Sequence, residues 1–495
     1  LRRTLGRPVL AGRFGPAAVP VAFCSALVWA VHPLLTESVT CVVQRTEVLG
    51  GLGILLALYA CIRHLEAGTD RRWAGVMVVA VYAGVAAKEI VAMAPLLLLA
   101  YDAVFVAGSW REAWTKRRRL YAALAGSWIL LVVLIAAGEQ RGGMVGYGLG
   151  VSAWEYLLTS SQAIGIYLKL SFWPHPLVLD YGTDVVRRLG AVWPQVALLT
   201  GLVLATVWGL VRRQPLAYAG FWFFVILGPS SSLLPLVSQT IAEHRMYLPL
   251  AAVIVPVVLA AYRGLGRWGL GLALAAAAGL SAATVARNAQ YESQVRIWTD
   301  TVAKRPGNSR AHSLLGLAFD RAGRWEEALV ASREAARLAP GSPEMHYNLG
   351  YVLLHTGRTV EAVDAFQVAL RLQPDYPEAH CNLGAAYLGL RRGREAQTHL
   401  EAALALRPAY ADAHFNLGNL YAQTGRIDRA IPSYRAALAA EPDRADAHFN
   451  LGKALLLAGQ PGEAATHFER VLQLTPDDAD ASRNLTEARA RAGQP

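Results

Sequence analysis

The stretch ADAHFNLGNLYAQTGRIDRAIPSYRAALAAEPDR, residues 411–444, decides the fold of the second half of this 495-residue chain. Gly418 and Ala430 are small residues placed where two paired helices would pack closely, and Pro442 closes the unit. The same pattern of residues recurs at a spacing of 34 before and after this stretch. A fixed period of this size predicts a stack of helix pairs.

The period extends from residue 306 to the end of the chain. Three residue types recur in register: Pro306, Pro340, Pro374, Pro408, Pro442 and Pro476; Gly316, Gly350, Gly384, Gly418 and Gly452; Ala328, Ala362, Ala396, Ala430 and Ala464. This pattern resembles that of tetratricopeptide repeats. Five full units and a partial sixth exceed the roughly three that a stable array needs. We therefore predict a helical solenoid over 306–495.

An asparagine also recurs in register along this array. The series comprises Asn348, Asn382, Asn416, Asn450 and Asn484. An amide both donates and accepts hydrogen bonds, so a ladder of amides on the concave surface can hold a peptide backbone without reading its sequence. The array resembles the superhelical repeats of O-linked N-acetylglucosamine transferase, where such a ladder grips substrate protein. The alternative is that Asn before Leu-Gly only fills the helix surface.

Histidines and cysteines do not indicate a metal centre. His312, His346, His380, His414 and His448 are in register, but equivalent helices stack ~8–10 Å apart while zinc needs His nitrogens at ~2.0–2.1 Å. We therefore expect these rings to pack between helices. The four cysteines show no CxxC spacing. These residues imply no metal site and no cofactor, and the participation of a divalent metal elsewhere in the protein is left open.

The first half of the chain is apolar. A mean hydropathy of +0.30 with 17% charged residues is too apolar for a wholly soluble protein, and apolar runs near 18 residues imply membrane-spanning helices. We predict nine spans, at about 16–31, 48–62, 73–87, 90–107, 120–137, 192–211, 216–227, 251–262 and 268–285. The segment 154–173 contains Glu155, Gln162 and Lys169, so we predict an interfacial or re-entrant helix there instead of a span.

Basic residues set the predicted orientation of these spans. Arg63, Arg71 and Arg72, the segment 111–119, Arg212-Arg213, and Arg263 with Arg267 lie in four loops that we place on the cytoplasmic side. The repeats then lie on the non-cytoplasmic side of a multi-pass membrane protein, in the cytoplasmic membrane if the source is bacterial. The net charge of +11 sits in clusters beside apolar runs, so it indicates a lipid bilayer and not a nucleic acid as partner.

Polar residues recur in the loops that this orientation places outside. They occur in His32–Val39, Gln44–Glu47, Ala86–Glu89, Pro174–Gly182 and Glu243–Pro249. Charge near membrane depth is costly, so acids and bases that gather at one end of a bundle suggest a shared polar cavity. The alternative is that each is a helix-end anchor or a local ion pair, as Lys88 with Glu89 could be.

These segments resemble a known family of membrane enzymes. The motifs that carry the resemblance are His32-Pro33 with Thr36-Glu37-Ser38, Arg45 with Glu47, Lys88-Glu89, Asp180-Tyr181, and Glu243-His244-Arg245 with Tyr247-Leu248-Pro249. In this order they resemble the bacterial-type transmembrane-and-tetratricopeptide-repeat proteins, which belong to the GT-C superfamily of membrane glycosyltransferases. Arg287-Asn288, Tyr291, Trp298 and Pro306 resemble the junction of such proteins with their repeats.

The resemblance implies transfer of a sugar, often mannose, from a polyprenyl-phosphate carrier to a protein hydroxyl. Cationic groups must then stabilise the departing lipid phosphate, and a carboxylate must take the acceptor proton. The carrier-phosphate and substrate candidates are Glu243, His244, Arg245, Lys88, Arg45, His32, Glu37 and Asp180. In this superfamily the catalytic acidic residue lies on the first outer loop. Because LRRTLGRP resembles the loop before the third span, we expect that residue upstream of Leu1 and assign no catalytic residue here.

The predicted fold is all-α, with a polytopic GT-C-like bundle over 1–286, a linker helix over 287–305 and tetratricopeptide repeats over 306–495. The leading function is a membrane glycosyltransferase whose repeats recruit the acceptor protein. The second is a non-enzymatic membrane-anchored scaffold for protein–protein interaction. A transporter would favour two similar halves, and no internal repeat precedes Val285.

Overall fold

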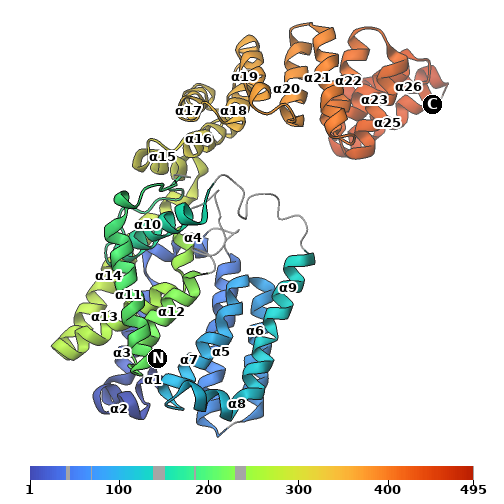
Figure 1. Cartoon of the computed structure of the whole chain (residues 1–495). Coiled ribbons are helices and arrows are strands. Elements are labelled where there is room, and N and C mark those ends of the chain that lie inside the picture. Colours follow the sequence, from blue (N-terminus) through green and yellow to red (C-terminus); the bar gives the residue numbers. More distant parts are fainter. Residues whose placement is uncertain (41–44, 69, 138–150, 183–184, 229–240, 494–495) are drawn as a thin grey trace. The chain divides into compact units, whose positions relative to one another are not determined.

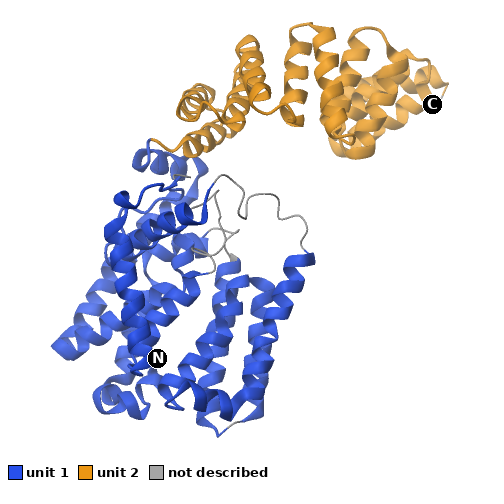
Figure 2. Cartoon of the chain, viewed as in Figure 1, with its two compact units in different colours: residues 1–306 blue, residues 307–495 orange. Residues whose placement is uncertain are grey.

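The computed structural model describes residues 1–40, 45–68, 70–137, 151–182, 185–228 and 241–493 (Figure 1). The described residues form helices and contain no strand. They divide into two compact units, Leu1–Pro306 and Gly307–Pro495 (Figure 2). Residues 287–305, predicted as a linker helix, therefore belong to the first unit, where they form the end of one helix and two further short elements.

The first unit contains α-helices (α) and 3-10 turns (η). They are α1 (Arg2–Leu5), α2 (Pro8–Phe14), η1 (Gly15–Ala17), α3 (Ala18–Ala30), η2 (Pro33–Leu35), α4 (Thr36–Thr40), α5 (Arg45–Glu66), α6 (Arg71–Ala87), η4 (Glu89–Met93), α7 (Ala94–Phe105), α8 (Trp110–Ala125), α9 (Ser127–Ala137), α10 (Ala153–Phe172), η5 (Leu189–Ala191), α11 (Trp193–Val211), α12 (Ala217–Gly228), η7 (Glu243–Met246), α13 (Pro249–Leu265), α14 (Arg267–Asn288), η8 (Ala289–Glu292) and α15 (Gln294–Lys304).

Among the described residues, five helical stretches are long and apolar enough to cross a membrane. By length and composition they are Pro8–Ala30, Thr46–Glu66, Trp110–Ala137, Trp193–Val211 and Arg267–Glu292, and Ala217–Gly228 and Pro249–Leu265 are shorter apolar helices. The spans predicted over 73–87 and 90–107 correspond to α6 and to η4 with α7, which belong to neither group. The prediction of apolar helices in this half is confirmed, whereas their number and sidedness stay predictions.

The outer surface of these helices is apolar. Ile129, Val211 and Trp268 are each at least 70% exposed. Exposed apolar surface on this scale is unfavourable in water and is compatible with a lipid environment.

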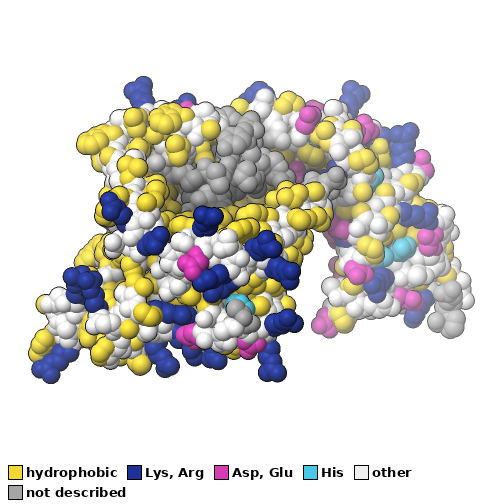
Figure 3. Space-filling view, turned by 60° about the horizontal axis from the view of Figure 1, so that its bottom comes forward, with side chains coloured by type: hydrophobic (Ala, Val, Ile, Leu, Met, Phe, Trp, Pro, Cys, Tyr) yellow, Lys and Arg dark blue, Asp and Glu magenta, His cyan; other side chains and the backbone are white. Residues whose placement is uncertain are grey.

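Lys and Arg side chains gather at the end of the first unit where the N-terminus lies. The turn between α5 and α6, the helix α8 and the turns after α11 and α13 lie toward this end (Figure 1). Figure 3, in which this end comes forward, shows Lys and Arg side chains lying between hydrophobic ones. Three arginines stack on tryptophan rings here: Arg63 on Trp73, Arg212 on Trp208 and Arg267 on Trp268. The polar loops considered below lie at the opposite end of the unit.

The second unit is the predicted solenoid. Its helices are α16 (Ser309–Arg321), α17 (Trp325–Leu338), α18 (Pro343–His355), α19 (Thr359–Leu372), α20 (Pro377–Gly389), α21 (Gly393–Leu406), α22 (Ala411–Gln423), α23 (Ile427–Ala440), α24 (Ala445–Leu457), α25 (Pro461–Leu474) and α26 (Ala479–Ala492). Glycine recurs in the first helix of each pair because the second helix packs against it. A Cβ at Gly418 would lie 2.6 Å from the Tyr434 ring, and one at Gly350 would lie 2.7 Å from Phe366.

The turn between the two helices of each pair contains a residue in the left-handed conformation. Gly323, Gly357, Gly425 and Gly459 have φ between 70° and 74°, but the third unit has Arg391 at this position, with φ of 57°. The left-handed conformation costs an L-residue roughly 1–2 kcal/mol and costs glycine almost nothing.

Replacing Arg391 with glycine is therefore expected to raise the free energy of unfolding of the solenoid by roughly 0.5–1 kcal/mol, after the entropy cost of glycine is subtracted. Urea denaturation of the detergent-solubilised protein, followed by circular dichroism, measures this change. The reciprocal variant Gly425→Arg should lower stability. An Arg391→Gly variant less stable than wild type would contradict the strain at this turn.

Candidate functional site

The buried turn η7 is the centre of the candidate site in the first unit. It contains Glu243, His244 and Arg245, which are 1%, 7% and 7% exposed. The segment that follows is held by two indoles, because Trp29 Nε1 donates to the Tyr247 carbonyl at 2.9 Å and Trp222 Nε1 donates to the Leu248 carbonyl at 3.0 Å. The preceding loop residues 229–240 lie outside the described residues. The two indole hydrogen bonds therefore hold η7 in place through the residues that follow it.

Glu37 and His244 form the most direct contact between two predicted site residues. The Glu37 carboxylate lies 2.8 Å from His244 Nδ1 and accepts a hydrogen bond of 3.1 Å from the His244 backbone N–H. Ser38 donates its hydroxyl to the His244 carbonyl at 3.3 Å. Three contacts thus clamp α4 to η7, although 206 residues separate the two segments in sequence. Glu37 fixes the orientation of the imidazole, as carboxylates do for histidines in functional sites.

Glu243 faces away from that pair, toward the loop after α10. Its Oε1 accepts hydrogen bonds from the Val178 backbone N–H at 2.6 Å and from the Tyr181 hydroxyl at 2.9 Å. Its Oε2 lies 3.8 Å from Arg287 Nη2, with no hydrogen-bond partner among the described residues. Burial raises the pKa of Glu243 to about 7, and the nearby Arg287 only partly opposes this increase. Glu243 is therefore a carboxylate whose charge changes near neutral pH.

A chain of charges connects Arg287 with the last helix of the first unit. Arg287 Nη1 lies 3.2 Å from Asp300 Oδ2, and Asp300 Oδ2 lies 2.7 Å from Lys304 Nζ. Lys304 also donates to the Leu177 carbonyl at 2.9 Å. Leu177 lies in the loop that binds Glu243, so the same loop contacts both ends of this chain of charges. Sequence reasoning missed Asp300 and Lys304 and assigned Arg287 to the junction only. The signal available was the motif Arg287-Asn288 followed by Tyr291.

His32 and Asp180 lie buried around the same turn. Leu34 N–H donates to His32 Nδ1 at 3.2 Å, so the ring proton is on Nε2, which bonds the Ser171 carbonyl at 3.2 Å. Burial lowers the pKa of His32 to about 4, so this ring is neutral at pH 7 and cannot act as a phosphate-binding cation. Asp180 is 2% exposed and accepts a hydrogen bond of 2.8 Å from the Gly182 N–H.

Lys88 pairs with a different residue from the one that its sequence neighbourhood suggests. Its Nζ lies 2.7 Å from Glu47 Oε1 on α5, whereas the local alternative was Glu89. Gly50 on α5 permits this approach, since a Cβ there would lie 2.9 Å from Lys88 Cβ. The next residue, Gly51, makes room for Tyr247, because a Cβ at Gly51 would lie 2.5 Å from the Tyr247 ring. Arg45 begins α5, but its side chain lies outside the described part of the structure.

Within the solenoid, the asparagine series links one unit to the next. Asn348 Nδ2 donates to Ser313 Oγ at 2.8 Å, Asn382 Nδ2 to the Tyr347 hydroxyl at 3.0 Å, and Asn450 Nδ2 to Asn419 Oδ1 at 3.0 Å. Asn416 Nδ2 approaches Cys381 Sγ at 3.7 Å, and Asn484 Nδ2 bonds the Asp480 carbonyl at 2.7 Å within its own helix. These amide donors therefore stabilise the array. Peptide binding by the same series stays a prediction.

The histidine series has a role other than helix packing alone. In four consecutive units Nε2 donates to the carbonyl of the proline six residues earlier, at 2.9–3.0 Å: His346 to Pro340, His380 to Pro374, His414 to Pro408 and His448 to Pro442. Each bond ties the start of one unit to the residue that ends the previous one.

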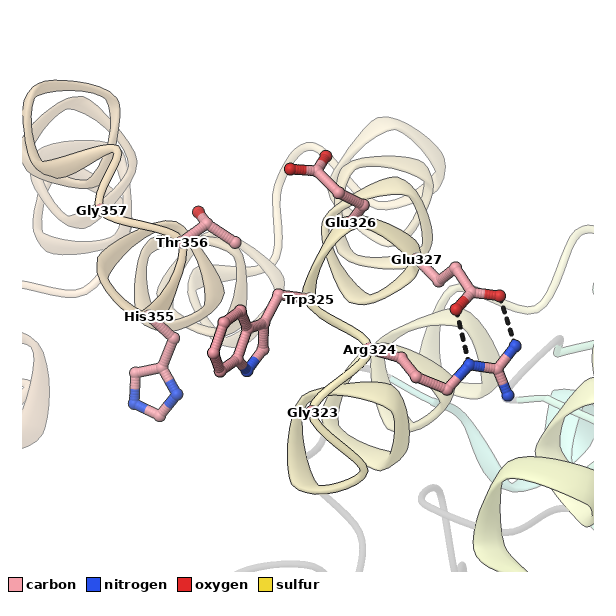
Figure 4. A pocket seen from close by; sticks show the side chains of 8 residues that line it. All are labelled: Gly323, Arg324, Trp325, Glu326, Glu327, His355, Thr356 and Gly357. Atoms are coloured by element: carbon pink, nitrogen blue, oxygen red, sulfur yellow. Dashed lines mark hydrogen bonds and ion pairs between the residues drawn. The ribbon is translucent and has the colours of Figure 1, made fainter.

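The solenoid also has an open pocket at the turns of its first two units (Figure 4). It is lined by Gly323, Arg324, Trp325, Glu326, Glu327, His355, Thr356 and Gly357. The Trp325 indole is 52% exposed and lies beside His355, while Arg324 pairs with Glu327. An exposed tryptophan with a charged rim is typical of protein contact surfaces. The pocket was not predicted from the sequence, because the prediction rested on residues that recur every 34 positions and Trp325 does not recur.

Comparison with known proteins defines the class of the second unit. Models of the tetratricopeptide repeat match residues 286–343, 381–438 and 419–479, and a further TPR repeat model matches residues 353–390. The chain thus combines an apolar helical unit with a tetratricopeptide-repeat solenoid. It is similar to protein O-mannosyl-transferase Tmtc2 of Drosophila melanogaster, with 30% identity over 212 residues. That match covers 40% of this chain and 22% of the relative, so the chain matches about a fifth of the relative's length.

Solved structures of other repeat proteins are also similar to this chain. A thermophilic TPR protein of Thermus thermophilus is 26% identical, with a TM-score of 0.33, over 37% of this chain and 99% of that one. A fragment of MamA from Desulfovibrio magneticus is 29% identical, with a TM-score of 0.31, over 34% of this chain and 97% of that one.

Proposed function

We propose that this chain is part of a membrane glycosyltransferase that moves a sugar, with mannose the first candidate, from a polyprenyl-phosphate carrier to a protein hydroxyl. The observation that carries the proposal is the buried cluster at η7. Acids and bases from segments far apart in sequence, Glu37, His244, Glu243 and Arg287, lie together at one end of an apolar helical unit. The similarity to an O-mannosyl-transferase supports the same reaction class.

The cluster suggests a division of roles in this reaction. Glu37 holds His244 Nδ1, which leaves Nε2 as the ring nitrogen available to a ligand, and Arg245 is the adjacent cation in the turn. We assign these two side chains to the carrier phosphate, whose negative charge grows as the sugar leaves. Glu243, engaged by Val178 and Tyr181, has a positioning role. No general base is assigned among the described residues.

The repeats would recruit the acceptor protein in this scheme. A solenoid presents a long surface to an extended partner, and the asparagine series and the Trp325 pocket are its two candidate contact regions. The two regions are distinct, since no member of the asparagine series lines the pocket.

Sugar transfer by the protein in a lipid bilayer tests the phosphate assignment. In an assay of mannose transfer from a short-chain polyprenyl-phosphate mannose to an acceptor peptide, His244→Ala and Arg245→Ala are each expected to lower kcat at least about 100-fold, as removal of one transition-state donor does. Arg263→Ala, an exposed arginine at the other end of the unit, should leave kcat unchanged.

A conservative variant separates chemistry from misfolding. Arg245→Lys keeps the charge, so it should retain more kcat than Arg245→Ala at equal melting temperature. Unchanged turnover in both alanine variants would overturn the phosphate assignment.

The second candidate is a non-enzymatic membrane-anchored scaffold. It is favoured by the burial of the charged groups at η7, each of which also contacts other parts of the protein fold. If the scaffold is the whole function, the protein transfers no sugar, and the His244 and Arg245 variants bind the partner protein as wild type does.

A further inference from the structure

Two histidine pairs in the solenoid are each joined by a hydrogen bond between their rings. The Nδ1 atoms of His380 on α20 and His399 on α21 lie 3.0 Å apart. Those of His448 on α24 and His467 on α25 lie 2.8 Å apart. Both pairs are part-buried. They occupy equivalent positions, so the third and fifth units, called the paired units below, contain the same arrangement.

The bonds to proline determine how many protons each pair can hold. His380 Nε2 donates to the Pro374 carbonyl at 3.0 Å, and His448 Nε2 donates to the Pro442 carbonyl at 2.9 Å. Nδ1 of these two rings therefore accepts, and the proton between the rings belongs to Nδ1 of the second histidine. One further proton can bind Nε2 of the second histidine without breaking this bond. The next must bind Nδ1 of the first histidine, where two N–H groups and two positive charges would face each other.

The pairing does not follow from the repeat pattern itself. His346 and His414, in the second and fourth units, make the same bond to proline at 3.0 and 2.9 Å. These units have Ala365 and Ser433 where the paired units have their second histidine. The fold thus accepts alanine or serine at this position, and the second imidazole is not needed for packing. The unpaired units provide controls within the same chain.

The surroundings of the second histidines also disfavour the charged ring. Burial, followed by the charge of the partner imidazole, lowers the pKa of His399 and of His467 from the ordinary 6.5. The uncharged Tyr387 ring stacks on His399 in the third unit. In the fifth unit Glu463 Oε1 lies 3.9 Å from His467 Nε2, but the same oxygen pairs with Arg435 of α23 at 2.7 Å. This carboxylate is therefore already neutralised by a cation.

We propose that the two histidine pairs form an acid-sensitive switch, which loosens the contact between the two helices of each paired unit as the pH falls below about 6. Once a unit opens, both histidines of its pair can be protonated below pH 6.5, whereas the closed pair accepts only one of these two protons. The stabilisation is therefore complete above pH 6.5 and is lost as the pH falls. The opening equilibrium of a paired unit rises by up to about 10-fold per pH unit. Each unit of a solenoid contacts only its neighbours, so the paired units can open without global unfolding.

Amide hydrogen exchange of the protein in detergent, followed by mass spectrometry at pH 5 and pH 7, tests this proposal. The rates are corrected for the intrinsic dependence of exchange on pH. We expect α20, α21, α24 and α25 to lose protection at least about 10-fold at pH 5 relative to pH 7. The helices α18 and α19 of the unpaired second unit should keep their protection. This comparison between units needs no substitution.

Two double variants identify the groups that respond to acid. In His399→Asn, His467→Asn an amide N–H takes the place of the Nδ1 proton and does not titrate, so protection should equal that of wild type at pH 7 and persist at pH 5. The control His346→Gln, His414→Gln removes titrating rings from unpaired units and should keep the acid response.

Three outcomes would overturn the proposal. In the first, the helices of the paired units lose no more protection in acid than α18 and α19 do. In the second, the asparagine variant responds to acid as wild type does. In the third, the glutamine control loses the response. Because exchange is measured on the solenoid, none of these outcomes depends on sugar transfer.

Discussion

Replacing Arg287 with leucine is expected to lower the free energy of unfolding of the first unit by about 1–2 kcal/mol at pH 8. Glu243, 1% exposed, would lose the cation 3.8 Å away, and its pKa would rise above its value of about 7. At pH 8 the side chain would take up a proton instead of staying charged in the interior, which limits the loss to about 1.4 kcal/mol per pH unit above that pKa. Asp300 is less affected than Glu243, because it keeps its ion pair with Lys304, whose Nζ lies 2.7 Å from Asp300 Oδ2. Titration with denaturing detergent, followed by tryptophan fluorescence, measures the loss. Twelve of the 13 tryptophans lie in the first unit.

A second substitution should recover most of this stability. In the variant Arg287→Leu, Glu243→Gln the buried charge is gone, and the amide oxygen can still accept hydrogen bonds from the Val178 N–H and the Tyr181 hydroxyl. Arg296→Leu is the control, because its pair with Glu292 is exposed and contributes about 0–1 kcal/mol. Equal losses for Arg287→Leu and Arg296→Leu would contradict a structural role for the buried pair.

The second large effect is a dependence of stability on pH. The pKa of Glu243 is raised to about 7 in the folded protein from an ordinary value of 4.5 in the unfolded chain. Between these values the folded state holds a proton that the unfolded state has lost, so the stabilisation is complete below pH 4.5 and disappears as pH rises through 7. At about 1.4 kcal/mol per pKa unit, the loss is about 3 kcal/mol.

Glu243→Gln should remove this pH dependence. The difference in free energy of unfolding between wild type and the variant, measured from pH 4.5 to 8, is expected to change by about 3 kcal/mol in favour of the variant as pH rises. Taking the difference cancels the titration of other groups, including His32. A pH-independent difference, or one of opposite sign, would show that burial does not dominate the environment of Glu243.

Much of the fold could be predicted from the sequence alone. The period of 34 places a glycine in the first helix of each pair, and the structure shows why, since Tyr434 or Phe366 fills the space that a Cβ would need. Apolar helices in the first half were also predictable, because the cost of exposing long apolar runs to water is a local property of the chain. Periodicity and hydropathy depend on residues that are close in sequence, so both can be determined before the tertiary structure is known.

The partners of the charged residues could not be predicted in this way. A local pair of Lys88 with Glu89 was one alternative, but Lys88 pairs with Glu47 on α5. The histidine series was expected to pack between helices; in addition its rings bind proline carbonyls, and two of them meet second histidines 19 residues away. Which side chains meet depends on the angle at which two helices cross, and the amino-acid composition contains no information about that crossing angle.

By itself, the sequence determined that this protein joins apolar helices to a tetratricopeptide-repeat solenoid, and that polar motifs cluster in a few loops. Only the tertiary structure decided which of those polar groups meet: Glu37 with His244, and Glu243 with Tyr181 and Arg287. The physical reason is the distance in sequence over which each effect is determined. Burial tendency and helical period are set within a few residues, whereas the energy of a buried charge depends on the group that folding brings within about 4 Å of it.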